Sequence, residues 1–221
     1  MGADPIAQPG GRGTAGTVAG RDRYALRWVG EQYACRADHL AQLLVRLGEP
    51  GAVSKPWIRT RVAGWERLGL VEQASVLTGE PPWIWLTRQG LSQVGLTFRV
   101  WRPKAWMLAH VAATNQVRLF IEPRRPGALW VPERELRHRA LHQPVPDAEI
   151  HDDTGTVTAV EVELSPKSTE RRRRVMQELV AHYDSVWYFA AAAAWAAVHD
   201  ALCAVPVQLT HLVRIYALED C

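Results

Sequence analysis

Residues 145–164, V-P-D-A-E-I-H-D-D-T-G-T-V-T-A-V-E-V-E-L, hold two short apolar runs on either side of a five-residue turn, H-D-D-T-G. Short runs of this kind, joined by a turn rich in Asp and Gly, predict an antiparallel β-hairpin. The second run places Glu161 and Glu163 on one face, because successive side chains of a strand point to opposite sides. Either that face looks at water, or its carboxylates have a chemical role.

The turn also predicts how the two strands pair. We expect Ile150 to lie opposite Thr156, and Asp147 therefore opposite Ala159. In this register Asp147 is a diagonal neighbour of Glu161 on the same face, close enough for the side chains to converge. Converging carboxylates repel each other unless a proton or a cation lies between them. Mg²⁺ or Mn²⁺ is the expected cofactor, because hard cations prefer oxygen ligands and can activate water for phosphodiester hydrolysis. The alternative is a sheet edge whose acidic face prevents aggregation.

The hairpin belongs to a longer series of predicted elements in the second half of the chain. Periodicity and breaking residues predict helices over 104–123, 165–184 and 191–204, and further strands near 129–131, over 185–190 and over 207–218. The order is α-β-β-β-α-β-α-β. We therefore expect a mixed unit of helices and strands over residues 101–221, of the α+β or α/β class.

The first half predicts a different unit. Helical stripes occur over 21–33 and 37–48, and Ser54 is placed to cap a third helix. Two apolar runs, 70–77 and 83–87, then flank a Gly/Pro turn, and a short helix over 87–95 follows. Three helices and a hairpin are the order of a winged helix-turn-helix, in which the third helix enters the major groove of DNA. We expect this unit over residues 21–100.

Cations on the third predicted helix are the candidate DNA contacts. Lys55, Arg59 and Arg61 share one side of it, where they would meet phosphates. Solvated charges on a helical hairpin are the alternative. The run 171–174, R-R-R-R, opens the helix that follows the acidic strand, so Arg171 and Arg172 could hold phosphates beside the acids or form a solvated face. The helix N-terminus at Ser168 and Thr169 could also receive a phosphate.

Composition is compatible with this interpretation. The net charge of +3 permits a nucleic-acid partner without requiring one. No run of about 18 uncharged apolar residues occurs, so we expect no membrane partner. Residues 1–20 are rich in Gly, Pro and Ala and have no apolar core, which predicts a disordered tail rather than a signal peptide. Three widely spaced cysteines favour a reducing cytoplasm.

The order of elements, with P-D at 146–147 and E-V-E at 161–163, resembles the PD-(D/E)xK nuclease superfamily. In that family an Asp, a second acid and a Lys surround one or two metal ions and cut phosphodiesters. The resemblance implies Asp147 and Glu161 as metal ligands, and Glu122 as the extra acid of some members. Glu163 stands at the position of the family's Lys, as in some members, and Lys167 is the residue that could substitute.

The chain also resembles the replication-relaxation family of actinobacterial plasmids and integrative elements. The matching segments are H-V-A-A-T-N-Q-V-R-L-F-I-E (110–122), L-W-V-P-E-R-E-L-R (129–137), V-P-D-A-E-I (145–150) and V-E-V-E-L-S-P-K-S (160–168). The resemblance covers about residues 21–218. It implies a DNA-handling role on a mobile element, in replication, origin processing or transfer.

Other polar residues are interpreted as structural. Glu133 and Glu135 are expected to pair with Arg134, Arg137 and Arg139 on a surface strand. Tyr183 and Tyr188 are expected to be packing residues, and His110 is the histidine most worth following because it lies in a family-like segment.

Two hypotheses result from the sequence. The first is a DNA-binding protein of a mobile element that nicks or cleaves DNA with Mg²⁺ or Mn²⁺, using Asp147 and Glu161 with help from Glu163, Lys167 and Glu122. The second is a non-catalytic winged-helix initiator or regulator with a degenerate nuclease-like domain. Both have double-stranded DNA as partner, and both leave open a homodimer or a contact with other proteins of the element.

Overall fold

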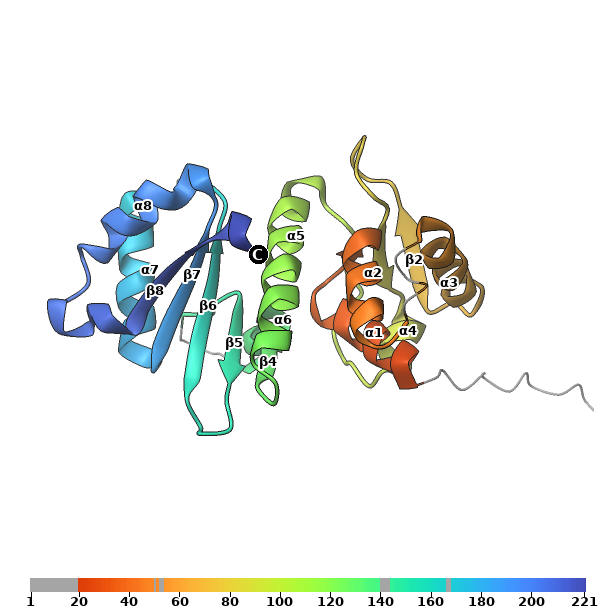
Figure 1. Ribbon diagram of the computed structural model, residues 1–221, viewed down its shortest axis with the longest axis horizontal. Helices are drawn as coiled ribbons and strands as arrows, with labels where there is room; N and C mark the ends of the chain where they lie inside the picture. Colours follow the sequence, from red (N-terminus) through yellow and green to blue (C-terminus); the bar gives the residue numbers. More distant parts are fainter. Residues whose placement is uncertain (1–19, 50, 52–53, 140–143, 166–167) are drawn as a thin grey trace, which may run out of the picture.

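A computed structural model of the chain describes residues 20–49, 51, 54–139, 144–165 and 168–221. It combines helices with two β-sheets, and Figure 1 shows one long helix, α5 (Ala105–Ile121), standing between them. The first unit, around a three-stranded sheet, precedes α5 in the chain, and the second, around a five-stranded sheet, follows it. The first sheet ends at Leu86 and the second begins at Leu129.

The first unit contains the predicted three helices and hairpin. Its elements are α1 (Gly20–Glu31), β1 (Cys35–Arg36), α2 (Ala37–Arg46), α3 (Lys55–Arg67), β2 (Val71–Ala74), β3 (Trp83–Leu86) and α4 (Arg88–Gln93). The sheet has the order β1-β3-β2 and both pairings are antiparallel. Strand β1 was not predicted, because two residues are too short to show any periodicity.

Local chemistry explains where two of these helices begin. The hydroxyl of Ser54 accepts a hydrogen bond from the backbone N–H of Trp57 at 3.3 Å, which confirms the predicted cap of α3. Thr87 caps α4 in the same way by accepting from the N–H of Gly90. Gly90 lets α4 approach the backbone just before β2, because a Cβ there would lie 1.9 Å from the carbonyl oxygen of Leu70.

His39 on α2 gives the first unit an expected acid sensitivity. Its ring is 2% exposed, and burial lowers its pKa from 6.5 to about 4, an effect that Asp38 opposes and Arg36 reinforces. In the unfolded chain His39 takes up a proton near pH 6.5, whereas in the folded chain it does so only near pH 4. Stability is therefore lost as the pH falls from about 6.5 towards 4. We expect about 2 kcal/mol of unfolding free energy to be lost between pH 7 and pH 5.

Urea unfolding of the wild type and of His39→Leu at both pH values checks this expectation. The variant should lose less stability than the wild type on acidification, by about the same 2 kcal/mol. Equal losses in the two proteins would show that other groups cause the acid sensitivity.

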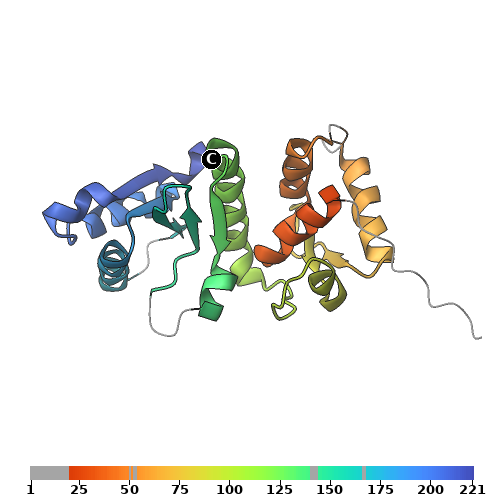
Figure 2. The same cartoon turned by 90° about the horizontal axis from the view of Figure 1, so that it is seen from below.

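Helix α5 is buried on two sides. One side joins the first unit, where Leu119 lies in its main core and Leu108 and Val111 pack with Trp83 and Trp85. The other side carries residues that pack on the second sheet: Ala113, Val117 and Ile121. Figure 2, viewed from below, shows the same helix between the two units. Burial on both sides explains a helix that is apolar nearly all round.

The second sheet is mixed. Its strands are β4 (Leu129–Pro132), β5 (Ala148–His151), β6 (Val157–Glu163), β7 (Ser185–Ala190) and β8 (Val213–Ala217), in that spatial order. Pairings from β4 to β6 are antiparallel, and those from β6 to β8 are parallel. Two crossover helices, α7 (Thr169–His182) and α8 (Ala192–Leu202), cover the face opposite α5 (Figure 1). The predicted order of elements is found except for an additional short helix between β4 and β5.

The predicted pairing of the hairpin is wrong by two residues. Ile150 lies opposite Thr158, not Thr156. His151, which was predicted to lie in the turn, pairs with Val157. The turn therefore covers residues 152–156. Asp152 stabilises it, because one of its carboxylate oxygens accepts hydrogen bonds from the N–H groups of Thr154 and Thr156. A shift of two residues leaves every side chain on its predicted face. Ala159 packs under α7, whereas Val160 and Val162 pack under α5.

Two further segments differ from their predicted form. Residues Glu133–Arg139 form a short helix, α6, rather than a surface strand. Its four-residue spacing allows Glu133 to pair with Arg137 and Glu135 with Arg139, as expected, but Arg134 is buried instead. Before β8, Val207–Leu212 is a 3₁₀ segment, η3, where the sequence predicted strand. In the described part of the chain, no helix has the length and apolar character needed to cross a membrane.

Candidate functional site

Asp147, at the entrance to β5, is the best-fixed acid of the candidate site. One carboxylate oxygen accepts a hydrogen bond from the backbone N–H of Val162 on β6, at 2.8 Å. The pairing of β5 with β6 ends at Ala148, which lies opposite Val160, so Asp147 and Glu161 are the next residues beyond this pair. The sequence predicted a diagonal neighbour. The observed register is shifted by two residues from that prediction, and the carboxylate of Asp147 is held by the N–H of Val162, the residue after Glu161.

The other oxygen of Asp147 points to α5. It lies 2.9 Å from Nε2 of His110, whose side chain is about one third exposed. A small cavity of about 30 Å³ adjoins the pair and is also lined by Thr114 and Glu133, which is room for one water molecule. The charge of Asp147 also acts on Arg137. The pKa of Arg137 is raised first by its hydrogen bond to Glu133 and in smaller part by the charge of Asp147.

Glu161 and Glu163 lie on the α7 side of the sheet, around Tyr188 of β7. Glu161 is the direct neighbour of Tyr188 in the parallel pairing. Tyr188 is 2% exposed, and its pKa is raised well above 10, first by burial and then by the charges of Glu161, Glu163 and Asp147. The charges of three acids thus act on one phenol, whose hydroxyl has no hydrogen-bond partner among the described residues. Tyr188 packs in the core under α7, as the sequence predicted.

Glu163 is not exposed towards a substrate. It is buried, and one of its oxygens lies 3.7 Å from Nε of Arg172 on α7. The side chain of Arg172 is only 2% exposed. The prediction that Arg172 holds DNA phosphates is therefore wrong, because the side chain packs between α7 and the sheet. Its neighbour Arg171 is exposed, as predicted, at the start of α7.

Glu122 is separate from the acidic cluster. It follows α5, where one oxygen accepts from Nε of Arg118 at 2.6 Å and the other from the indole of Trp28. His110 and Glu122 are twelve residues apart on nearly continuous helix, which corresponds to roughly 18 Å. Glu122 therefore belongs to the contact with the first unit, and its predicted catalytic role is wrong. The side chain that α5 does bring to Asp147 is His110.

Sequence reasoning missed Glu149. It lies two residues after Asp147 on β5, opposite Ala159 and therefore on the α7 side of the sheet. Its oxygens accept from the hydroxyl of Tyr183 at 2.8 Å and lie 2.7 Å from Nε2 of His151. Burial, followed by this hydrogen bond and the charges of Glu149 and Glu161, raises the pKa of Tyr183. The alternation P-D-A-E was the signal that could have found it.

The acids fit a divalent cation only in part. Among the described residues, no group of three or more His, Cys, Asp or Glu side chains could hold a metal ion. Mg²⁺ does not need such a group, because it usually keeps several waters and binds one or two carboxylates together with substrate phosphates. Asp147 and Glu161 are the pair that could supply these carboxylates. Lys167, the predicted helper, lies outside the described residues.

The predicted DNA contacts of the first unit divide into two groups. Lys55 and Arg59 are exposed on α3 and line a groove of about 910 Å³ between α2, α3 and the β2–β3 connection. Arg61 is turned away from it, because Asp22 holds its Nε at 3.0 Å and Glu49 lies 3.5 Å from its terminal nitrogen. Arg61 therefore ties α3 to α1 and the α2–α3 loop, and its predicted role in phosphate binding is wrong.

Comparison with known proteins gives no match to a family model, to a curated protein or to a solved structure. The geometry of the two units is therefore what a function can be argued from.

Proposed function

We propose that the protein binds double-stranded DNA through its first unit and nicks or cleaves it, with Mg²⁺ or Mn²⁺, at Asp147 and Glu161 of its second unit. The setting implied by the resemblance described above is replication or transfer of a mobile element. The observation that carries the proposal is the hydrogen bond from the N–H of Val162, which holds the carboxylate of Asp147 against β6 at the residue after Glu161.

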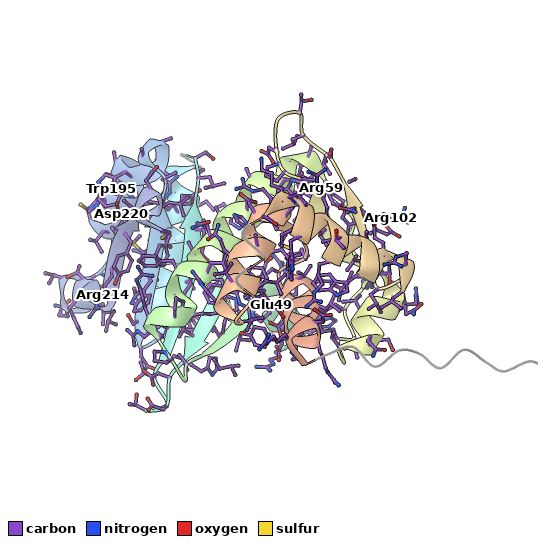
Figure 3. All side chains as sticks on the ribbon, turned by 45° about the vertical axis from the view of Figure 1, so that its right-hand side comes forward. Glu49, Arg59, Arg102, Trp195, Arg214 and Asp220 are labelled. Carbon is purple, nitrogen blue, oxygen red and sulfur yellow. The ribbon has the colours of Figure 1, made fainter. Side chains whose placement is uncertain are left out.

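The first unit supports DNA binding by its topology. The order α1-β1-α2-α3-β2-β3, with the sheet order β1-β3-β2, supports the assignment of this unit as a winged helix-turn-helix. In this arrangement α3 is the helix that would enter the major groove, and the β2–β3 hairpin would follow the backbone. Figure 3 shows Arg59 and Arg102 on the outer surface of this unit. Exposed cations near the helix and hairpin suit phosphates.

The second unit supports phosphodiester hydrolysis by its order of elements and its acids. Apart from the short helix α6 between β4 and β5, the series α5-β4-β5-β6-α7-β7 follows the α-β-β-β-α-β order expected of the nuclease superfamily, with Asp147 just before β5 and Glu161 on β6. A cation held there would polarise a phosphate oxygen and lower the pKa of a bound water. His110 fixes one oxygen of Asp147, and Arg137 adds positive charge nearby. Arg171 is exposed at the start of α7 and could meet the phosphate backbone.

A second candidate function is non-catalytic DNA binding. It is favoured by Glu163, which stands where the nuclease family has a Lys and is paired with the buried Arg172. An acid held in this way cannot supply the cation that the family's Lys brings to the phosphate. On this alternative, the second unit would serve as a structural or dimerising domain for the winged helix.

Supercoiled plasmid, incubated with the protein and Mg²⁺ or Mn²⁺, separates the two functions. The first predicts nicked or linear product that a chelator prevents. Bound duplex without any cleavage in either metal would leave the second function. Absence of both binding and cleavage would contradict the proposal as a whole.

Charge reversal on α3 tests the DNA-binding surface. We expect Arg59→Glu to weaken duplex binding roughly tenfold and to reduce the slope of log affinity against log salt by about 1, because one phosphate contact and its released counterion are lost. Fluorescence anisotropy with a labelled duplex at several salt concentrations measures both. Arg214→Glu is the matched control, because Arg214 is also exposed but lies on the other unit (Figure 3). Equal effects of the two reversals would show that α3 is not the binding surface.

A further inference from the structure

The segment joining the two units, residues 97–104, presents cations to solvent. Arg99, Arg102 and Lys104 are all exposed. Two aromatic residues of the segment pack against the rest of the protein. Trp101 packs on Tyr33 with ring centroids 5.5 Å apart, and Phe98 stacks on His138. Arg102 lies 3.9 Å from Glu72 of β2, so the segment passes beside the hairpin of the first unit. A basic strip therefore leads from the hairpin to the start of α5.

Trp106, in the first turn of α5, is the most exposed of the ten tryptophans. Its side chain is 78% exposed, whereas Trp195 is 38% exposed and six others are at most 7% exposed. Lys104 holds its ammonium 6.0 Å from the centre of the indole ring. A large aromatic face is thus displayed to solvent beside a cation, and no packing inside the described chain accounts for its position.

Trp106 is also next to the candidate site. It precedes His110 by four residues on α5, so the two side chains lie on one face of the helix, about 5–6 Å apart at Cβ. His110 in turn lies 2.9 Å from Asp147. The exposed indole of Trp106 therefore lies one helical turn from His110, which in turn contacts the carboxylate of Asp147.

We propose that Trp106 stacks on an unpaired base of the bound DNA, so that the preferred substrate has a single-stranded nucleotide or gap beside its duplex. This inference rests on the proposed function and names its substrate class. An indole offers a flat face to any base, and Lys104 and Arg102 are placed to meet the adjoining phosphates. A base inside an intact duplex is stacked on its neighbours and cannot use this face. The first unit holds the duplex, and Trp106 captures the unpaired nucleotide.

Binding to two labelled DNAs without divalent metal tests the inference apart from cleavage. One is fully paired, and the other has the same sequence with a short gap that carries 2-aminopurine, a base whose fluorescence falls when it is stacked. The wild type should bind the gapped DNA more tightly and quench the probe. Trp106→Ala should bind the gapped DNA roughly 5- to 100-fold more weakly and lose the quenching, with its affinity for the paired duplex unchanged.

Two variants make the result specific. Trp106→Phe keeps an aromatic face and should retain most of the preference for gapped DNA. Trp195→Ala removes another exposed tryptophan, on α8 of the second unit, and should change nothing (Figure 3). If Trp106→Ala binds gapped DNA as the wild type does, the inference is wrong and the indole serves another contact, such as a partner protein. Loss of binding to both DNAs alike would also contradict it.

The outcome is distinguishable from failure of the proposed function. A wild type that binds neither DNA contradicts the proposed function itself. A wild type that prefers gapped DNA through Trp106 but never cleaves supports the stacking role and contradicts only the catalytic part. Cleavage that proceeds with no dependence on Trp106 contradicts only the stacking role.

Discussion

Asp147→Asn is expected to reduce metal-dependent DNA cleavage on the order of 100-fold or more, while the fold and duplex binding persist. Asparagine has nearly the same shape and can still accept the hydrogen bond from the N–H of Val162. It lacks the negative charge that would hold the cation opposite Glu161. A metal ion stabilises the charge of the transition state by several kcal/mol, and each 1.36 kcal/mol lost is about a tenfold change in rate.

The chain offers a matched control for this substitution at the other end of β6. Asp184 also accepts a backbone N–H of that strand, from Val157 at 2.8 Å, but it is exposed and lies away from His110 and Glu161. Asp184→Asn should cleave plasmid as the wild type does. Glu161→Gln should lose cleavage like Asp147→Asn. Cleavage that survives both Asp147→Asn and Glu161→Gln would place the chemistry elsewhere in the protein.

Arg118→Leu is expected to lower the free energy of unfolding by about 3–5 kcal/mol, because it removes one partner of a buried ionic cluster. Arg118 is 5% exposed, and it donates to Glu31 at 2.9 Å and to Glu122 at 2.6 Å. Its guanidinium also lies over Trp28 and Trp130, so the cluster joins α1 and β4 to α5. The substitution would remove the cation that Glu31 and Glu122 share at the contact between the units, and would leave Glu31 with the half-exposed Arg27 alone.

Thermal unfolding measures this effect, as a fall in Tm of roughly 6–20 °C for a chain of this size. Arg27→Leu is the matched control, because Arg27 also donates to Glu31, at 2.8 Å, but is about half exposed. An exposed pair is worth about 0–1 kcal/mol, so the control should unfold close to the wild type. Arg118→Leu combined with Glu31→Gln should recover part of the loss. Similar melting of the two single variants would show that the cluster does not hold the units together.

Local patterns in the sequence predicted the elements around both sites. Ser54 signalled the start of α3, and the turn after β5 signalled the hairpin, because capping and turn chemistry depend on residues a few positions apart. The faces of β6 were predicted for the same reason, since alternation separates Ala159 from Val160.

The register of the hairpin needed information that the pattern does not contain. Both H-D-D-T-G and D-D-T-G-T provide five residues for the turn. The choice depends on the carboxylate of Asp152, which bonds to the N–H of Thr154 and keeps His151 in the strand. Only the structure shows that Ala148 lies opposite Val160 as a result.

Partners distant in the sequence were also beyond local patterns. Charge alone suggested surface roles for Arg61 and Arg172, but each is held by acids on other elements. One feature of the sequence could have indicated that Arg172 is buried. It shares a helical stripe with the buried Met176 and Leu179. The Pro after Glu122 directed the prediction to the wrong end of α5. No spacing rule connects His110 with Asp147, 37 residues later.

The position of a bound cation tests the central claim most directly. Crystals of the protein with gapped duplex DNA, soaked in Mn²⁺, should show an anomalous peak between the carboxylates of Asp147 and Glu161, and the peak should be absent in Asp147→Asn. A peak at another site, or no peak in wild-type crystals that contain bound DNA, would contradict the assignment of these two acids as the metal ligands.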